Sequence, residues 1–64
     1  MIDKLTLRQA RNLRGLSLSE VSEQLKVSRK TVENWEKGKT YPHAKSFIEL
    51  CKLYGVQLSD IFLG

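Results

Sequence analysis

The sequence predicts a small all-α domain built from five short helices. Helix-capping signals recur along the chain: Thr6 stands three residues before Gln9, and Ser17 stands three residues before Glu20. In such a capping box the hydroxyl accepts a backbone N–H of the first turn, and the later side chain reaches back to the cap. No segment combines apolar/polar alternation with the β-branched residues typical of strands. We therefore expect helices joined by tight turns.

The first three helices follow from caps and stop signals. Gly15 ends the first helix, because glycine adopts the left-handed conformation at a helix C-terminus at little cost. Ser28 caps the third helix, and Gly38 followed by Pro42 ends it. The expected helices span Thr6–Arg14, Leu18–Leu25 and Arg29–Lys37.

The second half of the chain predicts two more helices. The fourth spans Ala44–Tyr54 and ends at Gly55, and a short fifth helix spans Ser59–Leu63. Residues 1–64 are expected to form a single domain, close to the smallest size at which a core forms without disulfides or metals.

Apolar residues at helical spacing identify the expected core. Trp35 is the largest of them, and truncating it is expected to cost about 3–5 kcal/mol. Cys51 falls on the same face, so we interpret it as a small buried residue and not as a nucleophile. The expected core comprises Leu7, Ala10, Leu16, Val21, Leu25, Val27, Val32, Trp35, Ala44, Phe47, Ile48, Cys51, Tyr54, Val56, Leu58, Ile61 and Phe62.

The residues present argue against several classes of function. One Cys and one His do not supply the ligands of a structural zinc site, and no metal or cofactor is expected. The longest uninterrupted apolar run is 61–63, so we expect no segment to span a membrane. There is neither a Gly-rich phosphate loop nor a His-based catalytic dyad, and the chain is too small for an ordinary substrate pocket. We expect neither an enzyme nor a small-molecule receptor.

Positive charge is concentrated in the middle of the chain. The whole chain carries 11 Lys or Arg and 7 Asp or Glu, a net charge of +4. Residues 26–45 hold six of these cations and two of the anions, which equals the entire excess. A basic block within a folded domain suggests a surface for a polyanion such as nucleic acid, although solubility alone also explains it.

The predicted helix 29–37 has the chemistry of a DNA-reading helix. It turns Val32 and Trp35 to one side and displays Arg29, Lys30 and Asn34 on the other. Arg and Lys donate to the O6 and N7 atoms of guanine, and Asn pairs with adenine through two hydrogen bonds. The two cations at its start oppose the helix dipole by about 0.3–1 kcal/mol, so helix stability does not explain them.

Four segments of the chain form a pattern that is shared with a known family. They are Gly15–Val21, Leu25–Val32, Asn34–Lys39 followed by Pro42, and Leu50–Ile61. Through them the sequence resembles the lambda-repressor-like (Cro/XRE) helix-turn-helix family, and most of all the small regulators of bacterial phages and prophages. The resemblance implies a compact five-helix domain whose second and third helices form the helix-turn-helix.

The resemblance also implies roles for individual residues. Arg29, Lys30 and Asn34 would meet base edges in the major groove. Arg11 and Glu36 would form a buried ion pair that links the first helix to the end of the third. The residues implied to lie near phosphates are Ser17, Ser19, Thr31, Lys37, Lys39, Thr40 and Tyr41.

Three residues depart from the family pattern. Leu18 stands where many members have a DNA-contacting Gln, so that contact is expected to be absent. Ser22 replaces a common Ala, and its hydroxyl is expected to bond a backbone carbonyl. Lys26 takes a turn position usually given to Gly or Asn, in a left-handed conformation that costs about 1 kcal/mol.

The role of Glu33 has two interpretations. It lies at i,i+4 spacing from both Arg29 and Lys37, and we expect it to orient Arg29. A direct bond to the amino group of cytosine is the alternative. His43 and Lys45, which flank the start of the fourth helix, contact a phosphate or serve as plain surface residues.

We expect a sequence-specific transcriptional regulator, most simply a repressor, that binds double-stranded DNA in the cytoplasm, in a bacterial nucleoid or a phage-infected cell. A homodimer on a palindromic operator is expected, because two half-sites one helical turn apart match a two-fold dimer. The candidate dimer contacts are Leu58, Ile61, Phe62 and Leu63, which would equally close the monomer core. The alternative is a protein-binding module of the same fold, either an antirepressor or an antitoxin-like subunit.

Overall fold

The computed structural model describes residues 4–62, and within this range the fold is all-α. The elements are the helices Leu7–Arg14 (α1), Leu18–Leu25 (α2), Arg29–Lys37 (α3) and Ala44–Tyr54 (α4), followed by a 3-10 turn at Leu58–Asp60 (η1). The expected bounds of the second, third and fourth helices are confirmed, and the first begins one residue later than expected.

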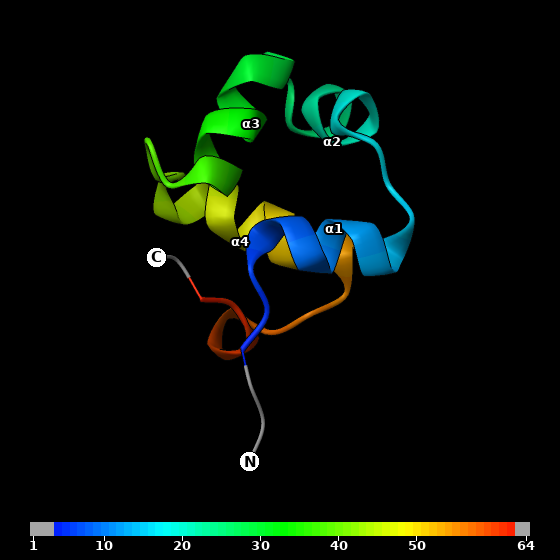
Figure 1. Ribbon diagram of the computed structural model, residues 1–64, viewed down its shortest axis with the longest axis vertical. Coiled ribbons are helices and arrows are strands. Elements are labelled where there is room, and N and C mark those ends of the chain that lie inside the picture. The colour runs from blue at the N-terminus through cyan, green and yellow to red at the C-terminus, as the bar shows by residue number, and fades with distance from the viewer. Residues whose placement is uncertain (1–3, 63–64) are drawn as a thin grey trace.

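The expected fifth helix at Ser59–Leu63 is wrong for its described residues, because the chain forms only the single turn η1 and is extended at Ile61. Ile61 then makes a parallel bridge with Leu5, beside the segment that leads into α1 (Figure 1). The Leu5 N–H donates to the Asp60 carbonyl at 2.8 Å, and the Phe62 N–H donates to the Leu5 carbonyl at 2.7 Å. The Asp60 carbonyl and the Phe62 N–H, which a longer helix would use, are therefore hydrogen-bonded to the residue Leu5 before α1.

Local capping explains where the helices begin and end. Thr6 and Ser17 form complete capping boxes with Gln9 and Glu20, so both predicted boxes are confirmed. The Ser28 hydroxyl accepts an N–H from the first turn of α3 at 3.1 Å. The glycines that end α1, α3 and α4 have left-handed φ angles of 75°, 77° and 72°, at Gly15, Gly38 and Gly55.

The core lies where α1 and α2 each pack against both α3 and α4, while η1 packs against α4 (Figure 1). Val21 and Leu50 are fully buried, and Val32 and Trp35 turn the inner face of α3 into this core. The predicted burial of Trp35 is confirmed at 8% exposure. The buried apolar residues are Leu7, Ala10, Val21, Val32, Trp35, Leu50, Cys51, Tyr54 and Ile61.

Part of the predicted core is wrong in α4 and after it. Ala44 and Ile48 are exposed, whereas Leu50, which the expected stripe omitted, is fully buried. The cause is that α4 carries apolar residues on more than one face, so its contacts with α1, α2 and η1 decide which face is covered. Leu58, in η1, and Phe62, after the extended Ile61, are also exposed. The expected core residues that are only half-buried are Leu16, Leu25, Val27, Phe47 and Val56.

Cys51 matches its interpretation as a small core residue. Its side chain is 3% exposed, and burial raises the pKa of the thiol, with a smaller contribution from the charge of Asp60. The protonated thiol is the unreactive form. Within residues 4–62, no three His, Cys, Asp or Glu side chains gather as a candidate metal site, and no helix has the length and apolarity needed to cross a membrane.

Two of the departures from the family pattern are Ser22, inside α2, and Lys26, in the turn that follows it. The Ser22 hydroxyl donates to the Ser19 carbonyl at 2.9 Å, as expected. Lys26 has φ 59° and ψ 43°, so the predicted left-handed residue is confirmed. Its N–H donates to the Ser22 and Glu23 carbonyls, which closes α2 despite the side chain.

Replacing Lys26 with glycine is expected to raise the free energy of unfolding by about 1 kcal/mol, because glycine adopts a positive φ without steric cost. Lys26→Ala removes the same charge but keeps a Cβ, so it should give no gain. Urea unfolding followed by circular dichroism compares the three chains. Equal stabilities of the glycine and alanine variants would show that the left-handed turn is not strained.

Candidate nucleic-acid interface

The exposed face of α3 begins with two cations. Arg29 and Lys30 occupy its first turn and are exposed, while Val32 and Trp35 on the opposite face are 1% and 8% exposed. No acidic residue stands in this first turn, so both cations oppose the positive end of the helix dipole, and the nearest carboxylate is that of Glu33, 4.0 Å from the Lys30 Nζ atom. The first turn of α3 therefore presents concentrated positive charge to solvent.

The start of α2 lies beside this face of α3. Leu18, the first residue of α2, borders a surface hollow together with Glu33 and Lys37 of α3. The other residues that line the hollow are Arg8, Arg11 and Glu36. The N-terminus of α2 and the exposed side of α3 thus belong to one continuous surface, as a helix-turn-helix requires.

The hydroxyl groups expected near phosphates are partly engaged within the protein. The Ser17 hydroxyl accepts the Glu20 N–H at 3.1 Å, and Ser17 is exposed, so its own O–H can still donate outward. Ser19 is half-buried in α2. The Thr31 hydroxyl lies 2.8 Å from that of Ser28, which couples it to the cap of α3. Of these hydroxyls, that of Ser17 is the most accessible to an anion.

The loop after α3 is held by the carbonyl of Asn34. This oxygen accepts the Lys39 N–H at 3.0 Å and the Thr40 N–H at 3.5 Å. Lys39, Thr40 and Tyr41 are all exposed, and Tyr41 is exposed to 58%. The loop at the end of α3 therefore has a hydrogen-bonded backbone and three exposed side chains.

The side chain of Asn34 is less accessible than the sequence suggested. The residue is half-buried, and its Oδ1 atom is buried with no hydrogen-bond partner among the described residues. A two-bond pair with adenine requires both amide atoms to face the base. In this conformation Asn34 does not present that pair, so Arg29 and Lys30 are the accessible members of the expected base-contact set.

The expected ion pair between Arg11 and Glu36 is present and is bidentate. The Nε and Nη2 atoms of Arg11 donate to the two carboxylate oxygens of Glu36 at 2.7 and 3.2 Å. The side chains are only 12% and 7% exposed. The hydrogen bond to Glu36 raises the pKa of Arg11 against the opposing effect of burial. Arg11 Nη1 also donates to the Leu16 carbonyl at 2.9 Å, so one guanidinium ties α1 to the α1–α2 loop and to α3.

Glu33 does not orient Arg29 as expected. Its carboxylate lies 2.9 Å from the Lys37 Nζ atom and 4.0 Å from the Lys30 Nζ atom. The bond from Lys37, together with the charges of Lys37, Lys30 and Lys39, lowers the pKa of Glu33. A Glu that precedes Lys by four residues is the favourable orientation on a helix, whereas a pair with Arg29 would reverse it.

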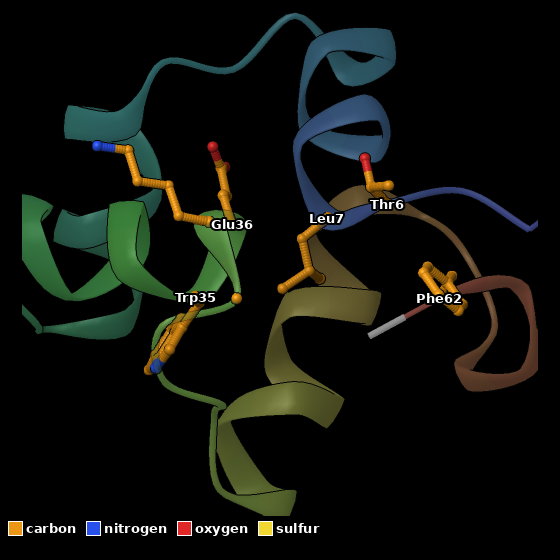
Figure 2. A pocket seen from close by; sticks show the side chains of 7 residues that line it. Thr6, Leu7, Trp35, Glu36 and Phe62 are labelled. Atoms are coloured by element: carbon orange, nitrogen blue, oxygen red, sulfur yellow. The ribbon is translucent and has the colours of Figure 1, made fainter. Parts of the chain in front are cut away.

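The candidate dimer contacts separate into three groups. Ile61 is 5% exposed within the core, so its assignment as a dimer contact is wrong for this fold. Leu58 and Phe62 are 47% and 56% exposed and stay available. Figure 2 shows Phe62 at a surface hollow that it shares with Leu7 of α1 and with Trp35 of α3. Leu63 lies outside the described residues.

Arg8 is a residue of this surface that sequence reasoning missed. It is exposed on α1, three residues before Arg11, and it lines the hollow with Leu18 and Lys37. The i,i+3 spacing of the two arginines places them on one face of α1, which was the available signal.

His43 and Lys45 are exposed at the start of α4, and the His43 side chain makes no capping hydrogen bond.

Comparison with known families agrees with this geometry. A profile of the helix-turn-helix family matches residues 7–61, which include all four α-helices. The chain belongs to this family, in its Cro/XRE form.

Two curated relatives are transcriptional regulators by name. The HTH-type transcriptional activator BcrR of Enterococcus faecalis is 34% identical over 58 residues, which cover 91% of this chain and 28% of the activator. The uncharacterized HTH-type transcriptional regulator MJ0272 of Methanocaldococcus jannaschii is 37% identical over 60 residues, which cover 94% of this chain and 91% of that protein. The chain thus spans under a third of the first relative and nearly all of the second. No solved structure matches the chain significantly.

Arg11→Ala is expected to lower the free energy of unfolding by about 3–5 kcal/mol, because it leaves the buried Glu36 carboxylate without its cation. Arg8→Ala is the matched control: it removes the same charge from the same helix at an exposed position, and should change stability by less than about 0.5 kcal/mol. Urea unfolding measures both. A similar small effect for the two variants would mean that the ion pair is solvated and contributes little.

Proposed function

We propose that the protein is a sequence-specific regulator of transcription that binds double-stranded DNA and inserts α3 into the major groove. The observation that carries this proposal is the first turn of α3, where Arg29 and Lys30 are exposed while Val32 and Trp35 of the same helix are buried. Arginine and lysine in this setting donate to guanine, and each such contact gives about 1–3 kcal/mol of discrimination between bases.

The surroundings of α3 support the same proposal. The start of α2 borders the same hollow as Glu33 and Lys37 of α3, and the exposed loop Lys39–Tyr41 directly follows the end of that helix. Ser17 and Lys39 offer an accessible hydroxyl and an ammonium group to phosphates, and the N-terminus of α2 adds free N–H groups. Both relatives are named as HTH-type transcriptional regulators, and this supports a role in transcription.

We further propose that the protein acts as a homodimer on a palindromic operator, with Leu58 and Phe62 as the contact. Both side chains are exposed beyond α4, and one domain of this size covers little DNA on its own. Repression is the proposed sign of regulation, through occupation of a site that polymerase would otherwise use, in the cytoplasm of the host cell. A reporter gene placed behind the selected operator distinguishes repression from activation.

Duplex binding is expected to weaken steeply with salt. About six phosphate contacts would reduce the association constant about 10³-fold between 50 and 200 mM salt. Fluorescence anisotropy with a labelled duplex measures this loss, and single-stranded DNA of the same length serves as a control. Failure to bind any duplex at 50 mM salt would reject DNA binding and favour a protein-binding module.

Two single substitutions are expected to separate base contact from phosphate contact. Arg29→Ala should relax preference at one base position in an in vitro selection, because it removes a donor to a base edge. Lys39→Ala removes one charge from the loop and should weaken all sequences alike, with a salt slope smaller by about 0.9. An unchanged selected motif for Arg29→Ala would contradict the assignment of this residue to base recognition.

A further inference from the structure

One carboxylate stands among the cations of the exposed face of α3. Glu33 lies one turn after the start of the helix, between Lys30 and Lys37, and its side chain is 36% exposed. One of its oxygens is 2.9 Å from the Lys37 ammonium, and the other is 4.0 Å from that of Lys30. Both oxygens are therefore directed to cations on this face.

This carboxylate already partners cations that a DNA phosphate would need. Lys37 is a proposed phosphate contact and Lys30 a proposed base contact, yet each already has an anion near its ammonium group. A phosphate that approaches Lys37 must replace Glu33 and also meets its negative charge. Non-specific affinity for DNA comes from the neutralisation of phosphates by protein cations. This affinity is therefore weaker where the cations are already neutralised within the protein.

The correct base sequence offers Glu33 a different partner. Once α3 enters the major groove, the amino group of a base lies within reach of groups on the exposed helix face, and carboxylates accept hydrogen bonds from cytosine N4. Glu33 would exchange its lysine for this amino group, and Lys37 would become free for a phosphate. A site without the amino group leaves the carboxylate facing acceptor atoms or phosphates.

We propose that Glu33 is a specificity-determining residue. It holds Lys37 away from phosphates until a base amino group, such as cytosine N4, donates a hydrogen bond to Glu33 in place of the Lys37 ammonium. This inference rests on the proposed function, since it requires α3 to be the helix that reads DNA. It goes beyond that function by assigning discrimination against non-cognate DNA to an internal ion pair. The internal carboxylate lowers affinity for all DNA, and the cognate base pair restores part of the loss.

The experiment compares wild type, Glu33→Gln and Glu23→Gln in the full chain. Glu23 is exposed on α2 and makes no ion pair among the described residues, so its variant adds the same charge without touching this cluster. Glutamine keeps the length of the side chain and suits a helix as well as glutamate does. Matching circular dichroism spectra of the three chains establish that each is folded.

Glu33→Gln is expected to bind random-sequence duplex about tenfold more tightly than wild type, with a salt slope steeper by about 0.9 for the lysine that is released. In an in vitro selection it should lose about tenfold of its preference at one base pair. Glu23→Gln should keep the wild-type motif and salt slope.

Equal effects of Glu33→Gln and Glu23→Gln on affinity, slope and motif would overturn the inference while wild-type binding left the proposed function standing. A wild-type chain that binds no duplex would overturn both, so the two failures are distinguishable.

Discussion

The position of α3 depends on the guanidinium of Arg11. Its bonds to both oxygens of Glu36 and to the Leu16 carbonyl join α1, the loop before α2 and the end of α3 at one point. Isolated burial of either charge would be costly, so the pair stabilises only the arrangement in which all three segments meet. That arrangement also sets the start of α2 beside the exposed side of α3. Apolar residues of similar size often stabilise a fold as much as a buried ion pair does, so net stability does not account for the pair. Its contribution is to fix how the three segments are placed relative to one another.

The helices were predictable because their signals are local. A capping box at Ser17, a hydroxyl at Ser28 and a glycine at Gly38 act within one turn, so they do not depend on the rest of the chain. The face of α4 and the end of the chain were not predictable in this way. Leu50 and Ile48 satisfy apolar periodicity about equally, and only packing against other helices buries one and exposes the other. The bridge between Leu5 and Ile61 joins residues far apart in sequence, which no capping or periodic signal reports.

The interface was predicted in outline, with errors that have physical causes. Arg29 and Lys30 are exposed as their position on the helix indicated, since the opposite face is plainly apolar. Glu33 has cations on both sides at the same spacing, and helix geometry favours the later one, Lys37, over Arg29. Asn34 is half-buried, with its side-chain oxygen buried, although its place on the helix indicated an exposed residue. Spacing along one helix does not contain that information.

Charge on α3 follows two opposing demands. Affinity for a polyanion favours uncompensated cations, and the first turn supplies them at the end of the helix where the dipole opposes them. Discrimination between sequences favours weak binding to phosphates, because phosphate contacts contribute the same affinity at every DNA site. Under our proposal Glu33 serves the second demand, because its carboxylate lies beside the ammonium groups of Lys30 and Lys37. Arg29 makes no ion pair among the described residues, so its charge stays uncompensated at the start of the helix. Affinity and discrimination would thus be divided between two places on α3, its first residue and Glu33.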